Sequence, residues 1–170
     1  VVGPMDGNTW GRYRFITERG QEPPFFLEPD HPDEWPQHFA AAGFTPLAHY
    51  RSSLTESLDY EDPKSVHAER QLAARGITLR TLDMSRWDEE LRQIYRITIA
   101  SFAGGFLYQP IPKESFHREI SRLKPMVRPE LVWIALREGN AIGYVFNIPD
   151  VLAAQRGRAI DTVILKTLAV

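Results

Sequence analysis

The clearest hydrophobic pattern along the chain begins at residue 77. A short β-leaning run at 77–82 is followed by apolar positions that recur at i, i+3, i+4, i+7 and i+11, namely Leu91, Ile94, Tyr95, Thr98 and Phe102. This period predicts an amphipathic helix that ends at Gly104-Gly105. Phe116, Ile120 and Leu123 predict a second helix between Pro112 and Pro125.

Three strands are predicted after these helices. The runs 131–137 and 141–148 flank Glu138-Gly139-Asn140, and two such runs around so short a turn predict a hairpin. The run from Asp161 to Val170 is almost entirely apolar or β-branched, which is typical of a buried central strand. The second half therefore has the order β-α-α-β-β-β.

The first half has weaker patterns and more turn residues. Short β-leaning runs lie at 13–17, 25–27 and 45–54, and a helix is predicted from Pro32 or Asp33 to a stop at Gly43. Asp62-Pro63 and Gly76 bracket a further helix, with an aspartate cap, a first-turn proline and a terminal glycine. Together the patterns predict an α/β chain of α+β layered type, a sheet with flanking helices.

Composition narrows the classes of function. The formal charge of -2 gives no reason to expect a nucleic-acid partner, and no apolar run is long enough to cross a membrane. The absence of cysteine excludes disulfides and thiolate chemistry and favours a cytoplasmic protein. No histidines lie at metal-ligand spacing, so we assign no metal. The sequence looks trimmed at both ends, as expected of a fragment.

Two stretches carry a resemblance to the GNAT N-acetyltransferase superfamily. The element order ending in Leu165-Lys166-Thr167-Leu168-Ala169-Val170 resembles the first half of a GNAT unit, with an incomplete acetyl-CoA-binding half. Phe39-Ala40-Ala41-Ala42-Gly43-Phe44 resembles a helix end in the other half. The resemblance implies a GNAT-like mixed sheet with three parts: residues 1–58 as the C-terminal half of one unit, 59–76 as a helical linker, and 77–170 as the N-terminal half of a second unit.

The resemblance also implies chemistry, which is acyl transfer from acetyl-CoA to a primary amine. Backbone amides of Leu168, Ala169 and Val170 would then bind the cofactor. Phe39 stands where many members of the superfamily have a tyrosine that protonates the departing thiolate, so the first unit lacks that acid.

Three residues of the first half are candidate catalytic groups. Glu28 and His31, in a proline-rich junction, can act as base and proton relay, or can simply cap a helix. Tyr50 can replace the missing tyrosine acid, or can be a half-buried packing residue.

Two hypotheses for function stay open. One is a piece of an N-acyltransferase with an unknown amine acceptor, and the other is a non-catalytic structural or self-association module of a tandem protein. Since the apolar strand at 161–170 needs partners, a homodimer is also predicted.

Overall fold

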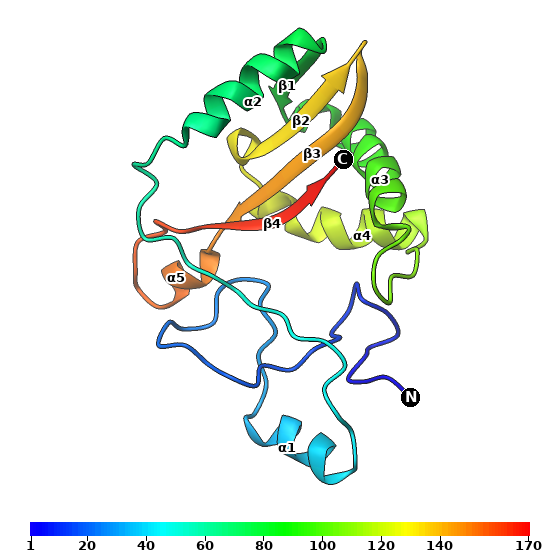
Figure 1. Ribbon diagram of the computed structural model, residues 1–170, viewed down its shortest axis with the longest axis vertical. Coiled ribbons are helices and arrows are strands. Elements are labelled where there is room, and N and C mark those ends of the chain that lie inside the picture. The colour runs from blue at the N-terminus through cyan, green and yellow to red at the C-terminus, as the bar shows by residue number, and fades with distance from the viewer.

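The computed structural model describes residues 1–170 and contains one four-stranded sheet (Figure 1). Its strands are β1 (Ile77–Thr81), β2 (Val132–Arg137), β3 (Asn140–Pro149) and β4 (Val163–Ala169), in the spatial order β1-β2-β3-β4. All three pairings are antiparallel. With its flanking helices, this sheet confirms the predicted α+β layered class.

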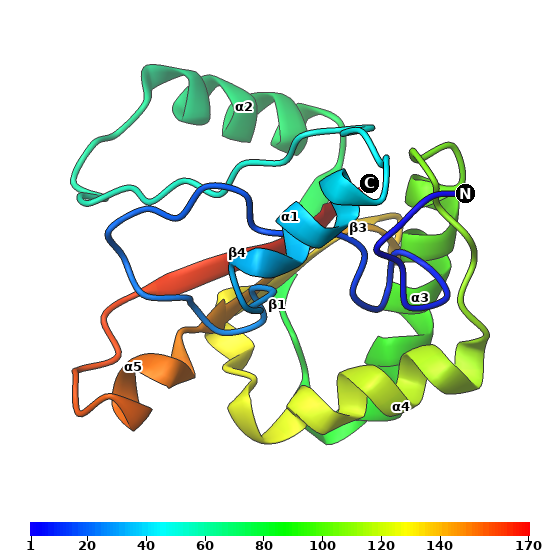
Figure 2. The same ribbon diagram turned by 90° about the horizontal axis from the view of Figure 1, so that it is seen from below.

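Helices lie on both sides of the sheet. They are α1 (Glu34–Ala41), α2 (Pro63–Ala74), α3 (Trp87–Phe102), α4 (Lys113–Leu123) and α5 (Val151–Gln155), with short 3-10 turns at Met84–Arg86, Lys124–Met126 and Pro129–Leu131. Figure 2 shows α2 on one side of the sheet and α4 on the other. No helix is both long enough and apolar enough to cross a membrane.

The local predictions are confirmed where turn and cap residues specify them. Glu138 and Gly139 both have positive φ, 51° and 76°, which gives the two-residue turn that matches the twist of paired strands. Asp62 accepts a hydrogen bond from the amide of Lys64 and caps α2, whose terminal Gly76 has a φ of 67°. The α5 helix was not predicted.

The core lies between the sheet and the α3–α4 layer. Alternate residues of β2 and β3 face this layer, because side chains of a strand alternate between its two faces. Fully or almost fully buried side chains from both layers meet there: Leu91, Ile94, Phe116, Val132, Ile134, Phe146 and Ile148. Arg80 of β1 reaches the buried Glu90 of α3, with an N–O distance of 2.8 Å.

The prediction of a central strand at 161–170 is wrong for this structure, because β4 lies at the edge of the sheet. It pairs with β3 alone, and the side chains of Leu165 and Leu168 are 66% and 58% exposed. A run that is apolar on both faces needs covering layers on both faces to be buried. Only one face of β4 has such a layer.

The strands expected at 13–17, 25–27 and 45–54 are also absent, and α1 is the one regular element of residues 1–58. The α1 helix itself confirms the predicted helix, with Gly43 at a φ of 87° beyond its end. β-leaning residues form a strand only where a neighbouring strand completes the backbone hydrogen bonds, and no such neighbour reaches these runs. The division into halves of two GNAT-like units stays a prediction.

Residues 1–58 pack against the end of the sheet that carries α5 (Figure 1). The buried carboxylate of Asp150 accepts a hydrogen bond from the amide of Phe26 at 2.8 Å. Trp10 donates its indole N–H to the carbonyl of Gln109, and its ring meets Phe116 edge-on at 5.7 Å. The two halves of one chain therefore pack against each other.

Candidate functional site

Arg14 lies at the centre of the predicted catalytic residues. Its guanidinium is 3.7 Å from the carboxylate of Glu28 and 5.6 Å from the ring centre of Tyr50. It also donates a hydrogen bond to the hydroxyl of Tyr13, whose ring meets that of Tyr50 edge-on. The guanidinium of Arg14 thus contacts both Glu28 and Tyr50. These two residues lie in extended segments that are not paired as strands.

His31 adjoins this group, and both of its ring nitrogens are engaged. The Nε2 atom accepts a hydrogen bond from the amide of Ile16 at 2.7 Å, so Nδ1 carries the proton and faces the carbonyl of Pro32 at 2.8 Å. A ring in this tautomer has no free lone pair for a substrate proton. As placed, His31 orders the chain around it, and its role as a proton relay stays a prediction.

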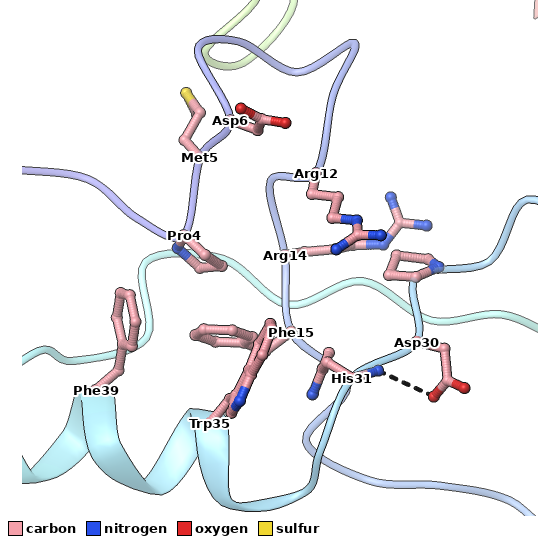
Figure 3. Close-up of a pocket in the computed structure, with 11 residues that line it drawn as sticks. Pro4, Met5, Asp6, Arg12, Arg14, Phe15, Asp30, His31, Trp35 and Phe39 are labelled. Carbon is pink, nitrogen blue, oxygen red and sulfur yellow. Dashed lines mark hydrogen bonds between the residues drawn. The ribbon is translucent and has the colours of Figure 1, made fainter.

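A cavity of about 360 Å³ adjoins Arg14 and His31 (Figure 3). Arg12 and Arg14 extend side by side along one part of it, while the rings of Phe15, Trp35 and Phe39 gather above α1. All of its lining residues come from the first 39 positions of the chain. The first half therefore encloses a mixed charged and aromatic pocket without any strand of its own.

The predicted cofactor-binding residues form the end of β4. Ala169 is buried at 2% exposure, whereas Leu168 and Val170 present exposed side chains. The hydroxyl of Ser101, on α3, donates to the carbonyl of Val170 at 2.6 Å. A side chain at Gly143 would meet Val170 at 2.9 Å, so only glycine lets β3 approach the end of β4 this closely.

Two tyrosine hydroxyls of the second half are buried, and one of them belongs to Tyr144, which pairs with Ala169 of β4. The Tyr144 hydroxyl is 2.8 Å from Thr98 Oγ1, and Thr98 gives its own proton to the carbonyl of Ile94, so the tyrosine is the donor. Burial raises the pKa of Tyr144, although the Thr98 hydrogen bond opposes the shift. The hydroxyl of Tyr108 is buried without a hydrogen-bond partner, and burial raises the pKa of this tyrosine too.

Lys166 of β4 lies near charged groups of the first half. It is the extra residue of a β-bulge, because Thr167 pairs with Phe146 and Leu165 already pairs with Asn147. Partial desolvation lowers the pKa of Lys166, although the residue as a whole is exposed; the charge of Arg14 lowers the pKa further, and Glu28 opposes the shift. Bulges take a side chain out of the regular alternation, and at this one the charges of Arg14 and Glu28 act on Lys166.

The edge of β4 offers hydrogen-bonding groups, and the side chains of Glu28 and Tyr50 offer groups that can transfer protons. Because β4 is an edge strand, alternate N–H and C=O groups point away from β3 and are suited to hydrogen bonds with a bound amide or thioester. Glu28 is a carboxylate that can take a proton from an amine, and Tyr50 is a phenol that can give one.

Sequence reasoning missed Arg14, Lys166 and Tyr144 as members of these clusters. Tyr144 had a signal, since it is a polar position on the core face of an alternating strand. Arg14 and Lys166 had none, because they lie 152 positions apart in the sequence and only the packing of the two halves brings them together.

Comparison with known proteins gives the following similarity. A protein named bacterial ceramide synthase, from Caulobacter vibrioides, is 30% identical to this chain over 76 residues. These residues are 45% of the chain, and they span only 20% of the relative. No protein-family model and no solved structure matches the chain, so the GNAT resemblance stays a prediction.

Proposed function

We propose that this chain is part of an acyltransferase that moves an acyl group from an acyl-CoA thioester to a primary amine. The observation that carries the proposal is the similarity to a protein named as a ceramide synthase. A ceramide is an amide of a fatty acid and a long-chain amino alcohol. Its synthesis is therefore N-acyl transfer, the reaction class that the GNAT resemblance implies.

The end of β4 is the part of the structure that fits an acyl-CoA donor. Bound there, the thioester would supply an activated acyl carbonyl. The edge of the strand from Lys166 to Val170 would hold that group through outward-facing amides, each worth about 3 kcal/mol where it meets developing negative charge. The Ser101 hydrogen bond to the carbonyl of Val170 fixes the position of this strand end.

Glu28 and Tyr50 are assigned the proton transfers. An amine arriving in its ammonium form must lose a proton before it attacks, and the Glu28 carboxylate would accept that proton directly or through water. Tyr50 would give a proton to the departing thiolate. Arg14 holds both side chains in place and is assigned a positioning role.

A direct test measures thiol release, because acyl transfer from acyl-CoA frees a thiol and this chain has no cysteine of its own. The donors are acetyl-CoA and palmitoyl-CoA, each offered with a long-chain amino alcohol, a polyamine or a short peptide. The assay uses this chain and the same chain in its natural sequence context. Amine-dependent thiol release supports the proposal, and its absence with every pair contradicts it.

Glu28→Gln tests the assigned general base. Glu56→Gln, in the exposed segment before α2, is its control. Loss of a general base lowers kcat by about 100-fold or more, whereas the control should keep full activity. Equal rates for the two variants would remove Glu28 from the mechanism.

The alternative function is a non-catalytic module that self-associates, and one observation favours it. The free edge of β4 and the exposed Leu165 and Leu168 offer a template for a second chain. Light scattering at increasing concentration, combined with the absence of thiol release, would favour the module. The predicted homodimer is tested by the same measurement.

A further inference from the structure

The pocket of the first half has an aromatic wall that suits a flat or apolar ligand. Phe15 meets Phe39 edge-on at 4.8 Å, and the ring of His31 stacks parallel to that of Trp35 at 5.8 Å. Figure 3 shows these rings together on the α1 side of the cavity, which has a volume of about 360 Å³. A wall of this kind with a few convergent polar groups is typical of small-molecule sites.

Two guanidinium groups lie across from this wall. Arg12 makes no side-chain hydrogen bond or ion pair within the chain, and Arg14 reaches its nearest carboxylate, Glu28, only at 3.7 Å. The ammonium group of Lys166 lies close to Arg14 and is likewise without an ion pair. Of these three positive groups, only Arg14 contacts a carboxylate.

The other acidic groups of the pocket do not cancel this charge. The carboxylate of Asp30 pairs with Arg19 at 3.0 Å and accepts the amide of His31, so it is already committed. Asp6 is the one carboxylate of the pocket without an ion pair: its backbone amide donates to the carbonyl of Arg12 at 2.7 Å, but its carboxylate pairs with neither arginine. The arginine side of the cavity therefore keeps an excess of positive charge.

We propose that this pocket binds an oxyanion, a phosphate or a carboxylate, carried on an aromatic or apolar body. Arg12 and Arg14 would grip the anion, because a planar guanidinium offers paired donors that match the oxygens of these groups. Phe15, Trp35 and His31 would cover the body of the ligand. No covalent step is involved.

Two sources of such an anion are compatible with the proposed function. One is the phosphate-bearing nucleotide end of an acyl-CoA donor, and the other is an acid group on the amine acceptor. The subsite would hold the charged end of either molecule while its reactive end extends toward β4. Binding itself requires no turnover, so it can be measured independently of acyl transfer.

The experiment is a calorimetric titration of the whole chain with three probes. The probes are 3′,5′-adenosine bisphosphate, phenyl phosphate and the neutral control adenosine. The variants are Arg12→Gln and Arg14→Gln, and Arg70→Gln on the exposed face of α2 is the matched control. Arg14→Lys keeps the charge but loses the paired donors. Circular dichroism confirms that each variant folds.

We expect both phosphates to bind and adenosine to bind at least about 10-fold more weakly. Each Arg→Gln change should weaken phosphate binding about 10-fold or more, since hydrogen bonds to charged groups are strong, and Arg14→Lys should fall between. Arg70→Gln should match the unmodified chain. Bisphosphate binding about 10-fold tighter than that of phenyl phosphate would assign the pocket to the donor, and equal binding would assign it to an acid group of the acceptor.

The proposal is overturned if neither phosphate binds with a Kd below about 10 mM. It is also overturned if adenosine binds as tightly as the bisphosphate. It is also overturned if both Arg→Gln variants bind like Arg70→Gln. Failure of these titrations while thiol release persists removes the subsite alone. Successful titrations without any thiol release leave the subsite in place and remove the proposed acyl transfer.

Discussion

Residues 77–170 contain all four strands and every fully buried side chain, whereas residues 1–58 contain one eight-residue helix and no fully buried side chain. The larger part is stabilised by a backbone ladder and a continuous apolar core. The smaller part is held by ring-to-ring contacts, by Arg14 and Arg19, and by its docking on Asp150. Apolar burial is the main stabilising contribution to folding, so most of the stability resides in residues 77–170.

The candidate functional groups are divided between the same two parts of the chain. Glu28, His31, Tyr50 and the two arginines lie in the part with little regular structure, while the strand end from Leu168 to Val170 belongs to the rigid part. Functional side chains often occupy loops that a rigid scaffold positions, and low local stability leaves them free to adjust to a ligand. In the proposed reaction, the interface between the two halves would decide whether both sets of groups face one substrate.

The largest expected effect is in the core of the rigid half. Leu91→Ala removes a side chain that is 1% exposed and should lower the free energy of unfolding by about 3 kcal/mol. Phe39→Ala, in the partly exposed aromatic cluster of the first half, should cost about 1 kcal/mol, because less area is buried there. Urea unfolding measures both values. Equal losses would contradict the unequal division of stability.

The next effect concerns the close contact between β3 and β4. Gly143→Ala places a methyl group 2.9 Å from Val170, and the resulting shift of the strand end should cost about 1–3 kcal/mol. It should also abolish the proposed acyl transfer. The control is Gly104→Ala, which meets no atom within 4 Å. Thermal unfolding measures the loss of stability, and thiol release measures the loss of acyl transfer. A Gly143→Ala chain as stable as the control would contradict the close contact.

A smaller effect is expected at the junction of the halves. Asp150→Ala leaves the amides of Phe26 and Leu152 without their acceptor and should cost about 1–2 kcal/mol. Residues 1–58 should then be cut faster by a protease, while the sheet stays resistant. Asp161→Ala, at an exposed carboxylate, is the control. Unchanged cleavage of Asp150→Ala would show that other contacts suffice to hold the first half.

The smallest effect depends on pH. Tyr144→Phe loses the hydrogen bond to Thr98 and should be about 1 kcal/mol less stable at pH 7. The raised pKa of Tyr144 means that the folded chain keeps this proton while the unfolded chain releases it near pH 10.0, so the unmodified protein loses stability as the pH rises through that value. The gap between the two proteins should therefore narrow above pH 10. Urea midpoints from pH 7 to 10.5 test this, and a constant gap would contradict it.

The sequence by itself determined the elements whose signals are local. The turn at Glu138-Gly139 and the ends of α2 at Asp62 and Gly76 depend on residues within about four positions, and each lies where the pattern predicts it. The apolar period of α3 likewise predicted the face that packs on the sheet. Glu28, His31 and Tyr50 were chosen from residue type and position, and their catalytic roles stay predictions.

Only the tertiary structure decided what depends on distant partners. β-leaning runs at 13–17 and 45–54 remain without a ladder, and the apolar run at 163–169 becomes an exposed edge, because strand pairing and burial are decided by competition among the whole set of segments. Arg14 meets Glu28 and Tyr50 and lies near Lys166 for the same reason. No local pattern encodes a contact between residues so far apart, because it forms only when the first half docks on the sheet.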